Sequence, residues 1–129
     1  MTGIADTGFL VAFANRHDRH HKWAVEVALR IDEALLTCDA VLAEAAFHLQ
    51  DSSLVLAMVR DGLVNPRFPT IDHQARLAEL AKRHEDRQPD LADLCLIRLS
   101  ELNPRLPGPP RDHPAASSAA KLQGPLRRP

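Results

Sequence analysis

Short apolar segments alternate with helical segments from Gly3 to Leu102, and this alternation restricts the fold more than any other feature of the chain. Strands are predicted at the start of Gly3–Phe13, at Leu35–Thr37 and at Leu63–Phe68. Helices are predicted at His20–Leu36, Ala40–Gln50, Leu54–Asp61, Asp72 to Glu85 and Asp90–Leu102. The pattern favours an α/β domain whose parallel sheet is covered by helices on both faces.

The positions of the acids follow from this layout. Ligands of parallel sheets bind beyond the carboxyl ends of the strands, and Asp6 stands at the end of the first predicted strand. We expect Asp39, Ser52 or Ser53, and Asp72 to cap the helices that follow them, because short polar side chains accept from the first backbone N–H groups of a helix.

The charge of the chain is unevenly distributed. Residues 1–103 carry 16 acidic against 11 basic residues, whereas residues 104–129 carry five basic residues and Asp112 as the single acid. A nucleic-acid enzyme with an acidic body needs metal ions to bring phosphates near its carboxylates. With 129 residues, one domain is expected. No signal peptide and no apolar run of about 20 residues is present, so we expect a cytoplasmic protein without a membrane segment.

The last part of the chain differs in composition. Residues 104–129 hold seven of the ten prolines and no β-branched residue. Proline removes backbone donors and biases its neighbours away from helix, and such a composition cannot build a core. We therefore expect a folded domain at residues 1–103 and a basic, disordered tail at residues 104–129.

Four acids lie in apolar surroundings: Asp6, Glu44, Asp90 and Asp93. Two of them have an ordinary explanation. Asp90 is placed to cap its helix, and Glu44 to pair with an arginine. Asp6 is harder to explain in this way, because a strand disfavours aspartate and an unpaired buried carboxylate costs several kcal/mol. Taken together, such acids repel one another unless a cation joins them, and all-oxygen ligands select Mg²⁺ or Mn²⁺.

Other chemistries find less support. Cys38 and Cys95 have no spacing typical of a zinc site, and we expect them to be reduced core residues. The histidines at 17, 20 and 21 lie in a polar turn, and Trp23 belongs to an apolar stripe with Val27 and Ile31. The chain has no tyrosine and four phenylalanines, which disfavours a protein that binds RNA by stacking. No helix pair carries the recognition face of a helix-turn-helix regulator.

Three acidic segments resemble those of the PIN-domain family, which includes VapC-type toxin ribonucleases of bacterial toxin–antitoxin pairs. They are the segments around Asp6, around Glu44 and around Asp93, and they occur in the family's order. The resemblance implies a parallel sheet sandwiched by helices and a ribonuclease that holds Mg²⁺ or Mn²⁺ with these three acids. Asp90 would be an accessory acid and Thr7 a supporting hydroxyl. RNA would be the substrate and an antitoxin protein the partner.

The resemblance stops after Leu102. Family members continue with an apolar strand and a fourth acid, whereas this chain continues with the proline-rich tail, as after a change of reading frame or the decay of a terminus. Asp112 falls near the position of the fourth acid and is an accessory candidate. Without the last strand, the edge of the first strand is expected to be open to self-association. The alternative to a ribonuclease is therefore an inactive relic that binds an antitoxin-like partner or itself as a homodimer.

Overall fold

Three short parallel segments form the centre of the computed structural model, which describes residues 3–109. Strand β1 (Leu35–Leu36) pairs in parallel with β2 (Val64–Asn65), with Leu35 opposite Val64. Ile4 pairs with Leu36 on the other side of β1 through an isolated parallel bridge. The predicted parallel sheet is confirmed, but it is smaller than expected, with two strands among the described residues.

The sheet is buried on both faces, because Ile4, Leu35 and Val64 are at most 2% exposed. A proline and an early helix start limit the length of its strands. The prediction of a strand over Leu63–Phe68 was too long, because Pro66 has no backbone N–H and β2 ends before it. The predicted first strand reduces to the Ile4 bridge, since helix α1 already begins at Thr7.

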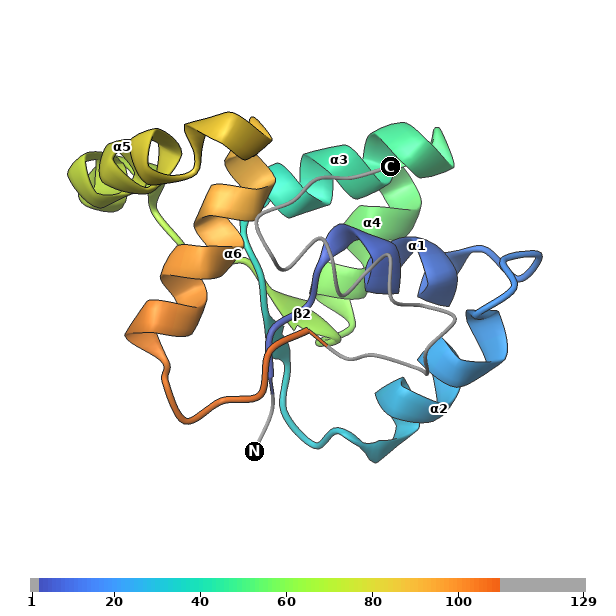
Figure 1. The fold of residues 1–129 in the computed structure, drawn as a ribbon. Coiled ribbons are helices and arrows are strands. Elements are labelled where there is room, and N and C mark those ends of the chain that lie inside the picture. The colour runs from blue at the N-terminus through green and yellow to red at the C-terminus, as the bar shows by residue number, and fades with distance from the viewer. Residues whose placement is uncertain (1–2, 110–129) are drawn as a thin grey trace.

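Helices surround this small sheet. Figure 1 shows α5 and α6 on one side, α1, α2 and α4 on the other, and α3 beyond the ends of the strands. The predicted covering of the sheet by helices is confirmed. The helices are α1 (Thr7–Ala14), α2 (His21–Arg30), α3 (Asp39–Leu49), α4 (Ser52–Arg60), α5 (Gln74–Arg83) and α6 (Leu91–Leu102), with 3₁₀ turns η1 (Thr70–His73) and η2 (Glu85–Arg87).

Several helices begin differently from the prediction. Cys38, and not Asp39, is the N-cap of α3, and Asp39 is its first helical residue. Asp51 caps α4 by accepting from Ser53 N and Leu54 N at 2.9 and 3.3 Å, so neither serine has the predicted role. Asp72 lies inside η1, and α5 begins after it. The helix dipole stabilises an acid both at the N-cap and within the first turn. The sequence alone therefore does not show which of these two positions an acid occupies.

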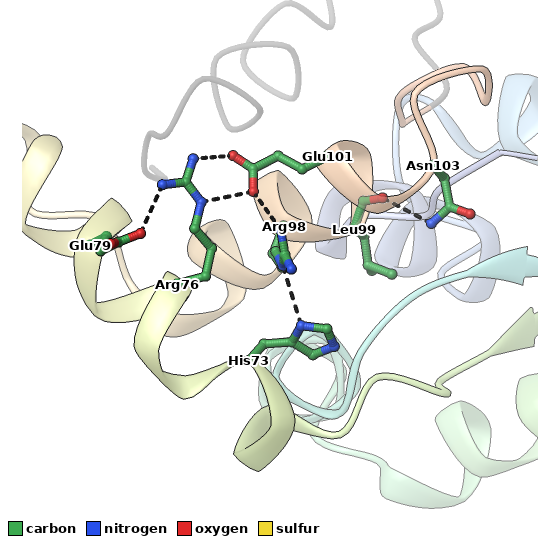
Figure 2. Close-up of polar contacts among 7 residues, drawn as sticks. All are labelled: His73, Arg76, Glu79, Arg98, Leu99, Glu101 and Asn103. Atoms are coloured by element: carbon green, nitrogen blue, oxygen red, sulfur yellow. Dashed lines mark hydrogen bonds and ion pairs between the residues drawn. The ribbon is translucent and has the colours of Figure 1, made fainter.

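Helix α5 is fixed against α6 by a network of ion pairs. Arg76 binds both carboxylate oxygens of Glu101, with Nε–Oε1 at 3.0 Å and Nη2–Oε2 at 2.5 Å (Figure 2). Arg76 also contacts Glu79, and Arg98 contacts Glu101 at 3.1 Å and donates to His73 Nδ1 at 3.2 Å. A planar guanidinium matches a carboxylate in this paired geometry, so the contact sets the orientation of α6 as well as its distance from α5.

The chain after α6 passes back along the sheet. Pro107 lies beside Gly3, where an added Cβ would meet Pro107 O at 3.1 Å, and the described part of the tail forms no strand there. Figure 1 shows this segment running next to the first strand segment. Most of the tail that we expect to be disordered, residues 110–129, lies outside the described residues. Asp112 lies outside them as well. Among residues 3–109, no helix combines the length and hydropathy that crossing a membrane requires.

Candidate active site

The first turns of three helices gather at the carboxyl end of the sheet. Helix α1 follows the Ile4 segment directly and α3 follows β1, so both begin where parallel strands end (Figure 1). Helix α6 packs against α3, and Cys38 and Cys95 are both fully buried. The N-terminus of a helix carries a partial positive charge, and three of them together favour anionic side chains or ligands at this place.

Asp6 is the N-cap of α1. Its Oδ1 accepts a hydrogen bond from Phe9 N at 2.9 Å, and the residue is 1% exposed. The sequence indicated an acid at the end of a strand, and the structure shows why aspartate is tolerated there: the strand ends at once, and the carboxylate satisfies backbone donors of the helix that follows.

Thr7 connects Asp6 to the second acidic segment. The Thr7 hydroxyl donates to Glu44 Oε1 at 2.5 Å, a contact between α1 and α3. Thr7 is 7% exposed and Glu44 is half-buried. Thr7 directly follows Asp6 in the chain. The structure therefore places Glu44 beside the first turn of α1, although Glu44 and Asp6 are distant in sequence.

Asp90 and Asp93 form a reciprocal cap at the start of α6. Asp93 N donates to Asp90 Oδ1 at 2.8 Å, and Asp90 N donates to Asp93 Oδ2 at 3.2 Å. Asp93 is 4% exposed. This is the capping-box arrangement, with aspartate in place of the usual glutamate or glutamine at the third helical position. The capping role considered for Asp90 is thus the one that the structure shows.

Cys38 precedes α3 and Cys95 lies in the second turn of α6. Both are buried free cysteines, which confirms the prediction of reduced core residues. The hydrogen bond to Cys95 and burial raise the pKa of the Cys38 thiol well above its usual range. Cys38 therefore stays protonated and acts as a small apolar residue with a weak donor.

The donor set suits a hard divalent cation, although the side chains do not surround one. Among residues 3–109, no three His, Cys, Asp or Glu side chains are grouped closely enough to hold a metal ion. Asp6, Glu44 and Asp93 supply only oxygen atoms, and two of them are buried, as Mg²⁺ and Mn²⁺ ligands commonly are. A carboxylate offers about four acceptor positions, so capping a helix and binding a cation are compatible.

Comparison with known proteins agrees with this arrangement. The family model described as the PIN domain matches residues 4–103, which include every described acid of the site. The chain belongs to the PIN-domain family. The sequence-based resemblance is thereby confirmed, and membership indicates nuclease chemistry in general. The match ends at the residue before the proline-rich segment begins.

Solved structures support the fold. The crystal structure of Mycobacterium tuberculosis VapC20, described as a toxin that cleaves the sarcin–ricin loop, aligns with a TM-score of 0.69 at 20% sequence identity. The alignment covers 80% of this chain and 84% of VapC20. A search of curated proteins gave no match. At this identity the likeness establishes the PIN fold, with its mostly helical body and small parallel sheet.

One feature of the site region escaped the sequence analysis. Phe47 is 78% exposed, although it lies in an apolar helix in which Val41 and Ala45 are fully buried. Its position three residues after Glu44 puts it on the same side of α3 as that acid. Of the histidines near the predicted polar turn, His17 is exposed, and His21 contacts Ala12 O through Nδ1 at 2.9 Å.

Proposed function

We propose that this PIN domain is a metal-dependent endoribonuclease of the toxin–antitoxin type, with Mg²⁺ or Mn²⁺ held by Asp6, Glu44 and Asp93. The observation that carries the proposal is the hydrogen bond from Thr7 to Glu44 at the start of α1, next to the buried Asp6. It joins two of the three acidic segments, and α6, which carries the third, packs against α3.

The residues of the chain have separable tasks in this proposal. When bound, the cation polarises the scissile phosphate and lowers the pKa of a coordinated water. The carboxylates of Asp6, Glu44 and Asp93 would bind the cation, and one of the three would also accept the proton of the attacking water. Thr7 orients Glu44 by its hydroxyl group. Asp90 acts as an accessory acid, because it positions Asp93 through the reciprocal cap.

RNA is the proposed substrate and an antitoxin protein the proposed partner. The support is family membership together with the VapC20 fold, and the RNA target of VapC20 is not carried over at 20% identity. A cytoplasmic location and a homodimer stay predictions from the sequence. The proposed domain boundary at residue 103 coincides with the end of the family match.

The test compares two aspartates that have the same role in the fold. Asp6 and Asp51 each cap a helix through Oδ1, but Asp51 caps α4 and has no place in the site. Asparagine is as good an N-cap as aspartate, so Asp6→Asn and Asp51→Asn should both leave thermal unfolding nearly unchanged. With Mn²⁺ and a mixed RNA substrate, we expect Asp6→Asn to reduce the cleavage rate at least ~100-fold, as losses of single catalytic groups commonly do, and Asp51→Asn to leave it unchanged. Equal activity of Asp6→Asn and wild type would remove Asp6 from the mechanism.

The inactive-relic alternative is favoured by one observation. Residues 104–109 form no strand beside the Ile4 segment, although the family places its last strand there. We expect the chain as it stands to cleave RNA more slowly per folded molecule than a version whose tail is replaced by a family-like strand and acidic ending. Misplacing reactants by about 1 Å costs up to ~10²-fold in rate, which sets the expected size of the gain. A wild-type chain that binds Mn²⁺ but shows no cleavage, while the restored version cleaves, would establish the relic.

A further inference from the structure

An exposed pair of rings stands on helix α3. Phe47 is 78% exposed, and its ring lies edge-on to that of His48, with centroids 5.7 Å apart and an interplanar angle of 72°. The other aromatic side chains of α1 and α2 are packed, since Phe9 contacts both Phe13 and Trp23. Leu29 and Ile71 are exposed to the same degree, but Phe47 is the one aromatic residue among the exposed large hydrophobic residues of the described part of the chain, and an aromatic ring is able to stack a nucleobase.

The pair lies next to the proposed catalytic acid. Phe47 and His48 follow Glu44 by three and four residues, so all three share one side of α3. The separation along the helix is about one turn, or ~5 Å. That distance is comparable to the reach from a phosphate to the base of its own or the next nucleotide. A base belonging to an RNA cleaved at Glu44 would therefore arrive at Phe47.

The turn after α1 carries two arginines, Arg16 and Arg19, with the half-buried Asp18 between them. Helices α1 and α3 pack side by side and run in the same direction, so the turn after α1 lies towards the end of α3 that carries Phe47 (Figure 1). That turn exposes Arg16, His17 and Arg19. Proteins that hold single-stranded RNA commonly combine cations that contact phosphates with an aromatic ring that stacks a base.

We propose that Phe47, edged by His48, stacks an unpaired base of the RNA substrate beside the scissile phosphate. The inference rests on the proposed ribonuclease function and adds to it a residue that positions the substrate by stacking one of its unpaired bases. Phe47 is a positioning residue, because it touches the base and not the reacting atoms. Stacking accepts any base, so the platform confers preference for unpaired RNA and not for one sequence.

The test uses full-length protein and a short single-stranded oligo(U) with one 2-aminopurine. In an Asp6→Asn background, which blocks cleavage, we expect Phe47→Ala to weaken RNA binding about 5- to 100-fold, the range for loss of one base–aromatic stack. Phe47→Trp should bind like the parent. Leu29→Ala is the matched control, since Leu29 is 80% exposed on α2, and it should also bind like the parent. Quenching of 2-aminopurine fluorescence should occur with the parent and disappear with Phe47→Ala.

An abasic position in the RNA makes the test independent of any effect on folding. Removing the stacked base should weaken binding to the parent but hardly change binding to Phe47→Ala, because both changes remove the same contact. If Phe47→Ala binds and cleaves like Leu29→Ala while the wild type cleaves RNA, the stacking proposal is wrong and the ribonuclease stands. If Phe47→Ala instead changes the molecular mass measured by light scattering, the ring belongs to an interface between copies. A wild-type protein that neither binds nor cleaves RNA overturns both proposals.

Discussion

The start of α6 allows the capping and metal-binding roles of one aspartate to be measured separately. Asp90 Oδ1 accepts from Asp93 N at 2.8 Å, and Asp90→Ala removes this bond. The return bond to Asp93 Oδ2 comes from the backbone N–H of residue 90, so alanine retains it. We therefore expect Asp90→Ala to lose one N-cap interaction, or about 1 kcal/mol of the free energy of unfolding. For a domain of this size, that lowers the melting temperature by roughly 4–8 °C.

Serine at the same position separates cap from charge. Ser is as good an N-cap as Asp, so Asp90→Ser should melt within a few tenths of a kcal/mol of the wild type, about 1–3 °C. It lacks the carboxylate, however. If Asp90 is an accessory acid of the metal centre, the rise in melting temperature that Mn²⁺ produces in the wild type should be smaller in Asp90→Ser, because this rise depends on affinity for the folded state.

Circular dichroism melts with and without Mn²⁺ measure both quantities. Asp51→Ala is the control, because it removes a helix cap outside the site; it should lower the melting temperature and leave the Mn²⁺-induced rise intact. If Asp90→Ser melts as low as Asp90→Ala, the stabilisation comes from the charge of Asp90 and the capping argument fails. If both variants keep the full Mn²⁺-induced rise, Asp90 has no part in metal binding.

Two further outcomes follow from the contacts. The hydrogen bond from Arg76 lowers the pKa of Glu101, and Arg98 lowers it further. The stabilisation from this network is therefore present above the ordinary pKa of a glutamate, about 4.3, and is lost as the pH falls through the lower pKa of the folded state. Glu101→Gln should therefore melt lower than wild type at pH 7, and the difference should shrink in acid and in high salt; a pH-independent difference would contradict this. Removal of divalent ions with EDTA should abolish RNA cleavage while the circular dichroism spectrum stays unchanged, and an unfolded spectrum would show that the metal holds the fold.

The elements that the sequence predicted well are those whose signals are local. The start of α6 was predicted within one residue, Asp90 against Leu91, because Pro89, Asp90 and Asp93 form a helix-start pattern ahead of an apolar run. Asp6 was recognised as exceptional because its surroundings are apolar. The parallel sheet and its helical cover followed from alternation alone.

The elements predicted poorly depend on contacts between distant parts of the chain. The first strand is a single bridge because its only strand partner among the described residues is Leu36, and pairing ends once Asp6 begins capping α1. The exposure of Phe47 could not be read from its segment, since alanines around it suit a buried helix and a surface helix equally. The signal available was its spacing from Glu44, which becomes informative only after Glu44 is assigned to the site.

The same physical feature explains why the acids are tolerated and why they are suited to a cation. Buried carboxylates usually need a positive partner, and here part of that role belongs to helix N-termini: Asp6 accepts from Phe9 N, and the Asp93 carboxylate accepts from the backbone of residue 90. These N–H groups are supplied by the fold, so the acids are stabilised before any metal arrives. A carboxylate has about four acceptor positions, so capping of a helix and the proposed binding of a cation are compatible. In the proposed centre, folding would therefore not depend on metal binding, in contrast to small structural zinc sites, where the ion itself supplies the folding energy.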